Sequence, residues 1–167
     1  MTLGMVHLRV RFAAMAAGLM LSAGMAHAQA RCPWLNVATA SGVLNGPASL
    51  EMRQPAPNET HCLFRRNDSE LTLEIVVKSQ QDVSQGITAE QAACTSPVTR
   101  VQAIGNEALL CADDHKPTRG SEVIGRVRDS VFRVVIVTRA RNDPALARDV
   151  LEQKARDTAE QVAGSLF

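Results

Sequence analysis

Arginine side chains recur in the stretch 122–139, which carries the strongest strand pattern of the sequence. Two runs rich in Val and Ile, joined at Asp129-Ser130, predict an antiparallel hairpin, because β-branched residues suit strands and Asp-Ser suits a tight turn. With the loop at Asp129-Ser130, Arg126 would lie directly opposite Arg133. Two like charges in that position need an opposite charge between them.

The missing negative charge could come from the protein or from a ligand. Glu74 or Glu122 could lie at a neighbouring position of the same sheet face. Alternatively, an anionic small molecule or an acidic protein surface could bind there, and the positive patch would then continue through further arginines, namely Arg128, Arg139 and Arg141. We therefore predict a ligand-binding face that contains Arg126, Arg133, Arg128 and Arg139.

Acid-base chemistry would need a different set of residues. His115 follows Asp113 and Asp114, and Ser121 is close in the sequence. A hydrolase, however, needs a nucleophile held on a rigid turn beside an oxyanion hole, and no Gly-x-Ser-x-Gly motif is present. The charged stretch 113–120 is typical of a solvated loop, so we predict no catalytic residues.

Four cysteines, Cys32, Cys62, Cys94 and Cys111, predict two disulfides if the chain reaches an oxidising compartment. Of the three possible connectivities we favour Cys32 with Cys62 and Cys94 with Cys111, since each ties a short helical segment to a nearby strand. A zinc site or a redox-active pair is not favoured, because the sequence has no Cys-x-x-Cys and no His-x-x-x-His spacing. We expect neither a metal nor another cofactor.

Composition limits the possible partners. The chain carries 18 basic and 17 acidic side chains, so no overall field attracts nucleic acid or an anionic membrane. Aromatic residues are scarce, with one tryptophan and no tyrosine, which argues against carbohydrate and nucleobase stacking sites. Trp34 is therefore expected in the core, and His61 is expected to be a half-exposed strand residue.

The N-terminus has the pattern of a secretory signal peptide. Arg9 and Arg11 precede an apolar run over 12–23, and Ala26-His27-Ala28 is a small-x-small cleavage site. The sequence thus predicts a signal peptide over 1–28, with cleavage possible after 30, and a single domain over 31–167. No later segment is long enough to span a bilayer. Because Arg31 precedes Cys32, a lipid anchor is not expected, and the protein is predicted to be periplasmic or secreted.

Hydrophobic periodicity predicts an α+β fold. An N-terminal helix should begin at Cys32-Pro33 and end at Asn45-Gly46. A C-terminal helix, capped by Asn142 or Asp143, should cover the hairpin with an alanine-rich stripe. Strands are expected over 47–52, 61–66, 70–78, 99–104 and 106–112, besides the hairpin, with a loop over 79–86 and a short helix over 88–94. We predict an antiparallel sheet of about five to six strands packed on the N-terminal and C-terminal helices.

The segment Gln102-Ala103-Ile104-Gly105-Asn106-Glu107-Ala108, together with the cysteine order and the closing helix, carries a family resemblance. The mature chain resembles extracytoplasmic sensor-like and lipoprotein domains of the PknH type. This resemblance implies an α+β sandwich with a two-disulfide frame and a cleft for a ligand or partner, and it implies no enzymatic activity.

The sequence analysis leads to two functional hypotheses. The first is an exported, non-enzymatic binding domain that recognises an anionic small molecule or an acidic protein surface. The second is a periplasmic inhibitor or immunity-type protein that inserts a loop, 79–86 or 113–120, into a secreted enzyme.

Overall fold

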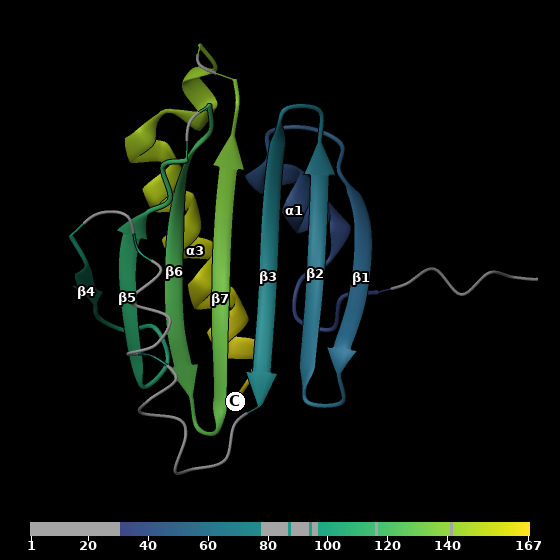
Figure 1. The fold of residues 1–167 in the computed structure, drawn as a ribbon, viewed down its shortest axis with the longest axis vertical. Helices are drawn as coiled ribbons and strands as arrows, with labels where there is room; N and C mark the ends of the chain where they lie inside the picture. The colour runs from purple at the N-terminus through teal and green to yellow at the C-terminus, as the bar shows by residue number, and fades with distance from the viewer. Residues whose placement is uncertain (1–30, 78–86, 88–93, 95–96, 116, 141) are drawn as a thin grey trace, which may run out of the picture.

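A computed structural model describes residues 31–77, 87, 94, 97–115, 117–140 and 142–167. The predicted signal peptide, the loop over 79–86 and all but Cys94 of the predicted helix over 88–94 lie outside these residues. Within them, the chain forms one antiparallel sheet in the order β1-β2-β3-β7-β6-β5-β4 (Figure 1). The seven strands, where five to six were predicted, are β1 (Ser49–Ala56), β2 (Glu59–Arg66), β3 (Ser69–Val77), β4 (Thr99–Val101), β5 (Glu107–Ala112), β6 (Arg119–Val127) and β7 (Ser130–Thr138).

Two α-helices lie on the same face of this sheet (Figure 1). The first, α1 (Val37–Val43), begins later than predicted, because Asn36 is its cap and accepts a hydrogen bond from the Thr39 amide at 2.8 Å. It ends at Val43, and Asn45, two residues later, has the left-handed φ of 58° that is typical after a helix end. Asp143 caps a 3-10 turn, η1 (Pro144–Leu146), which leads into the long helix α3 (Arg148–Ser165). The prediction that Asn142 or Asp143 caps this helix is wrong, because α3 begins after Ala147, which has no side-chain cap.

The main core lies between the helices and the sheet. Large side chains of β2, β3 and β7, including Phe64, Leu71 and Phe132, are fully buried there. From α3 they are met by the predicted stripe, whose buried members are Leu151, Ala155, Ala159 and Val162. The small alanines let the helix approach the sheet closely, and the prediction that this helix covers the hairpin is confirmed. Trp34 packs against the rim of the same core.

The opposite face of the sheet is divided in two. Over β5, β6 and β7 it carries a set of apolar side chains that are each at most 9% exposed. They do not belong to the main core and comprise Leu109, Ile124, Val131 and Val135. The Cys94–Cys111 disulfide anchors the connection between β3 and β4 to this side. This half of the face, where the ligand-binding arginines Arg126 and Arg133 were predicted, is therefore largely buried.

Both disulfides have the predicted connectivity. Cys32–Cys62 ties the segment before α1 to β2 inside the main core. Cys94–Cys111 lies on the other face of the sheet, since Cys111 follows Leu110, a main-core residue, along β5. Among the described residues there is no free cysteine and no helix that is long and apolar enough to cross a membrane.

The hairpin register differs from the prediction. Its two-residue turn is Arg128-Asp129, so Val127 pairs with Ser130, and Arg126 pairs with Val131 instead of Arg133. Asn106 holds this turn: its amide donates to the Arg126 carbonyl at 2.7 Å, and its side-chain oxygen accepts from the Arg128 amide at 2.7 Å. The Ile-Gly-Asn-Glu segment, singled out for its family resemblance, thus has a structural role beside the β6–β7 turn.

The observed register places the Phe132 ring over Gly125. A Cβ at residue 125 would lie 2.2 Å from Phe132 Cζ, which no side chain can tolerate without moving the ring. We expect Gly125→Ala to lower the free energy of unfolding by about 1 to 3 kcal/mol, because the ring is fully buried and has no free space. Urea denaturation measures this change.

The control is the same substitution in a Phe132→Leu background. There the clash is removed, so Gly125→Ala should cost clearly less than in the native chain. Equal costs in the two backgrounds would show that the ring does not lie over Gly125.

Candidate functional site

The predicted arginine pair does not exist. Arg126 lies opposite Glu107 on β5 and Val131 on β7, whereas Arg133 lies opposite Ile124 and Glu74. Arg133 instead binds Glu122 through two hydrogen bonds, Nε to Oε1 and a terminal guanidinium nitrogen to Oε2, the latter at 3.2 Å. Glu122 is 1% exposed and Arg133 is 30% exposed. Of the two readings of this arginine, the one in which a neighbouring glutamate compensates it is confirmed.

The other arginines of the predicted patch are far apart. Arg128 lies in the β6–β7 turn with its guanidinium carbon 5.7 Å from the centre of the Phe167 ring. Arg139 follows the opposite end of the nine-residue strand β7, about 30 Å away. It borders a hollow of only about 120 Å³. Arg141 lies outside the described residues, so the structure brings no cluster of these arginines together.

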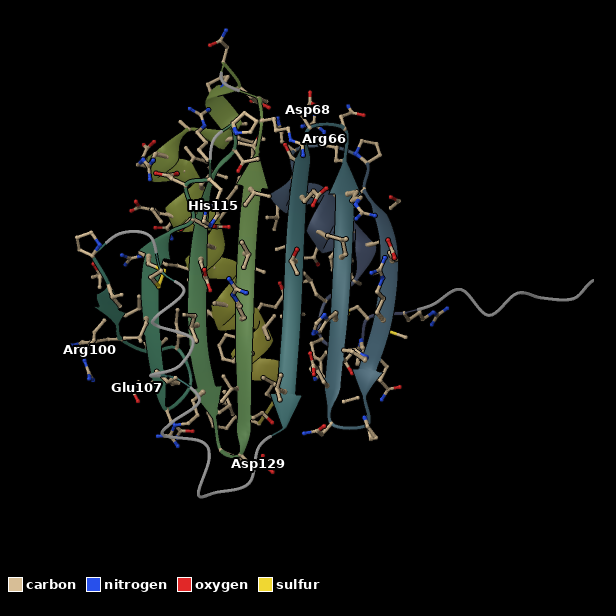
Figure 2. The ribbon with its side chains drawn as sticks, in the orientation of Figure 1. Arg66, Asp68, Arg100, Glu107, His115 and Asp129 are labelled. Carbon is tan, nitrogen blue, oxygen red and sulfur yellow. A yellow bond between two sulfur atoms is a disulfide. The ribbon has the colours of Figure 1, made fainter. Side chains whose placement is uncertain are left out.

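The candidate acid-base residues are not assembled either. His115 is 68% exposed, and its Nε2 lies 3.0 Å from an Asp113 carboxylate oxygen (Figure 2). Ser121 is fully buried, and its hydroxyl has no hydrogen-bond partner in the part of the chain that the structure describes. The loop that contains His115 is tied to α3 by an ion pair between Asp114 and Arg148. His115 and Ser121 therefore form no catalytic pair.

The exposed half of the second sheet face, over β1 to β3, is a network of compensated charges. Glu51 binds Arg53 and, at 2.8 Å, Arg65, which also lies 3.4 Å from Glu70. These guanidinium groups, Arg53 first, hold the pKa of Glu51 below its usual value. His61 Nε2 lies 2.5 Å from Glu59. No group of three or more His, Cys, Asp or Glu side chains within the described ranges could hold a metal ion.

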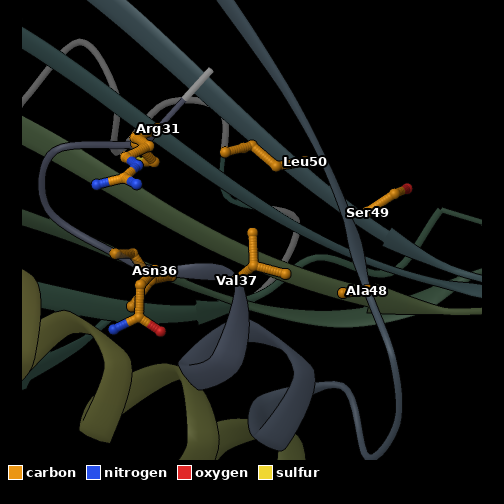
Figure 3. A pocket seen from close by; sticks show the side chains of 8 residues that line it. Arg31, Asn36, Val37, Ala48, Ser49 and Leu50 are labelled. Atoms are coloured by element: carbon orange, nitrogen blue, oxygen red, sulfur yellow. The ribbon is translucent and has the colours of Figure 1, made fainter. Parts of the chain in front are cut away.

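A groove of about 620 Å³ lies between α1 and the edge strand β1 (Figure 3). Its volume falls in the range of small-molecule sites. One charged side chain, Arg31, lies among its lining residues, which are Arg31, Cys32, Leu35, Asn36, Val37, Ala48, Ser49 and Leu50. The groove therefore combines an apolar surface with a single positive charge.

Two covalent or polar links hold the walls of the groove. The Cys32–Cys62 disulfide fixes the segment that carries Arg31 against β2. The Ala48 amide donates to the Ser41 hydroxyl of α1 at 3.0 Å, which fixes the start of β1 relative to the helix. Asn36 accepts the capping hydrogen bond with its side-chain oxygen, so its amide nitrogen can still donate to a ligand.

Sequence reasoning missed this groove. In the sequence analysis, Arg31 is considered only as the residue before Cys32. Val37 and Leu50 fit the patterns of an ordinary helix and an ordinary strand. The one signal in the sequence is the apolar Val37 directly after the capping residue Asn36, but that Val37 is 38% exposed is seen only in the structure. Without the packing of α1 against the end of the sheet, that signal does not define a cavity.

Comparison with known protein families, curated proteins and solved structures finds no match. The resemblance to sensor-like and lipoprotein domains of the PknH type stays a prediction.

Proposed function

We propose that this protein is an exported, non-enzymatic binding domain that holds an anionic, partly apolar ligand in the groove between α1 and β1. The observation that supports the proposal most is the lining of this groove, which combines the apolar Val37 and Leu50 with the positively charged Arg31. Such a lining matches a ligand that has an apolar body and one negative group. The anionic ligand class of the sequence analysis is kept, but its site moves away from the sheet face.

The two disulfides support export, and cleavage of the signal peptide would add positive charge near the groove. Two disulfides are stable in the periplasm or outside the cell, and are rare in the cytosol. Cleavage of the signal peptide after residue 28 or 30 would create an α-amino group at most two residues from Arg31. The mature chain would then carry a second positive charge close in sequence to the groove.

Arg31→Gln tests the proposal directly. With 1-anilinonaphthalene-8-sulfonate as an amphipathic anionic probe, we expect the dissociation constant to rise about tenfold, because a charge-assisted contact is lost. Fluorescence titration of the mature, disulfide-bonded chain measures it. The matched control is Arg100→Gln, which removes the same charge from the 81% exposed Arg100 on β4 at the far edge and should leave the affinity unchanged.

A second pair of variants tests the apolar wall. Val37→Glu adds a negative charge to the groove at the first position of α1, where a carboxylate suits the helix. It should therefore abolish probe binding while the chain stays folded, and Val37→Gln should bind at an intermediate level. Probe binding that responds to neither Arg31→Gln nor Val37→Glu would rule out the groove as the site.

A further inference from the structure

The outer edge of β1 is free of any described partner strand. β1 ends the sheet order next to β2, and Figure 1 shows it at the border of the sheet. In an antiparallel edge strand, every second residue directs both its N–H and its C=O outward. An edge of this kind can accept a further strand from another chain.

The groove includes this edge. Ser49 and Leu50 are consecutive, so their side chains point to opposite faces of β1, yet both residues line the groove. The Ser49 hydroxyl lies 3.5 Å from the Arg65 carbonyl oxygen on β2, and Figure 3 shows its side chain directed away from Val37. Ser49 therefore contributes mainly its main chain to the groove wall.

Features that block strand addition lie elsewhere. Pro55, which lacks an N–H, and an irregular register between Arg53 and Ala56 mark the far half of β1. The 71% exposed Arg53 adds a charge there. At the opposite border, β4 has only three residues. The segment of β1 beside the groove, around Ser49 and Leu50, is the part of the edge that these features leave open.

We propose that the ligand of the groove is an extended peptide segment that pairs with β1 at Ser49–Leu50 as an additional strand. An apolar side chain of this peptide lies against Val37 and Leu50, and its carboxylate, from a C-terminus or an acidic side chain, binds Arg31. This inference depends on the proposed function and names the chemical class of its ligand. Main-chain hydrogen bonds would provide affinity, and the groove would select the side chain.

The test uses a pool of acetylated hexapeptides, randomised at the last three positions, in a free-acid and a C-terminally amidated form. Each pool is passed over the immobilised mature chain and over its Arg31→Gln variant, and retained peptides are sequenced. We expect the native chain to retain peptides with an apolar residue beside a carboxylate at least about tenfold better than the variant. Enrichment in the amidated pool assigns the carboxylate to a side chain, and enrichment in the free-acid pool alone assigns it to the C-terminus.

Backbone pairing is tested on the best retained peptide. Two versions of this peptide are compared, one N-methylated at the odd positions and the other at the even positions. Only every second amide of a paired strand faces β1, so one version should bind at least about tenfold more weakly and the other should be clearly less affected. Amide hydrogen exchange should slow at Ser49–Glu51 when the peptide binds, with no change at β4. The inference would be overturned if both N-methylated versions lost affinity equally, or if hydrogen exchange slowed away from β1.

The two proposals can fail separately. If 1-anilinonaphthalene-8-sulfonate binds in an Arg31-dependent way but no peptide is retained over the variant, the groove is a ligand site and the strand-addition inference is wrong. If the anionic probe binds without dependence on Arg31 and Val37, the proposed function is wrong as well.

Discussion

Arg133→Ala is expected to lower the free energy of unfolding by about 3 to 5 kcal/mol, because it leaves the carboxylate of Glu122 buried without its counter-charge. Glu122 is 1% exposed, and Arg133 supplies both hydrogen bonds that its side chain accepts in the described part of the chain. Its neighbours on this face, Ile124 and Val135, are apolar and buried. Chemical denaturation of the disulfide-bonded protein measures the loss.

Two further variants separate this cause from a general loss of packing. Glu122→Ala should cost less than Arg133→Ala, since the remaining Arg133 is 30% exposed and water can solvate it. The double variant Glu122→Leu, Arg133→Leu should recover most of the stability, because an apolar pair suits this surface. If the double variant is as unstable as Arg133→Ala, stranded charge is not the cause.

Removing the Cys32–Cys62 disulfide, by Cys32→Ala with Cys62→Ala, is expected to lower the free energy of unfolding by about 3 to 4 kcal/mol. The bridge closes a loop with a sequence separation of 30 residues, and opening it increases the entropy of the unfolded chain. It also releases the segment that holds Arg31 beside β1, so the affinity for the anionic probe should fall by about tenfold or more. Denaturation and fluorescence titration measure the two effects.

The second disulfide provides the matched control. Cys94→Ala with Cys111→Ala opens a loop with a separation of 17 residues and should cost about 3 kcal/mol. Because this bridge lies on the other face of the sheet, the groove affinity of the folded variant should not change. A similar loss of affinity in both double variants would mean that the groove is not positioned by Cys32–Cys62.

Much of the fold could be predicted from the sequence because alternation and capping residues act locally. The strands and the alanine stripe of α3 follow from patterns within short segments, and the disulfide pairing follows from which cysteines lie next to a strand. The hairpin register did not, because moving the turn from Asp129-Ser130 to Arg128-Asp129 keeps the same side chains on the same faces. The choice depends on Asn106, which is distant in the sequence.

The candidate site was less predictable, since it arises from contacts between separate elements. The pairing of Arg133 with Glu122 depends on the true register, and the groove depends on how α1 lies against β1. The burial of Ile124 and Val135 on the second face was also not predicted, because the sequence indicates a cover, the C-terminal helix, for one face only. Consecutive apolar residues, such as Val134 to Val137 in β7, are in fact typical of strands covered on both sides.

The order of the strands also has a consequence for incomplete chains. β3 pairs along its full length, from Ser69 to Val77, with β7, which is the last strand in the chain and lies in the middle of the sheet. Until β7 has paired with β3, the edge of β3 that carries Leu71 and Leu73 is open. Chains that end before β7 would keep this open edge of β3. We expect such chains to self-associate by edge-to-edge pairing instead of accumulating as monomers.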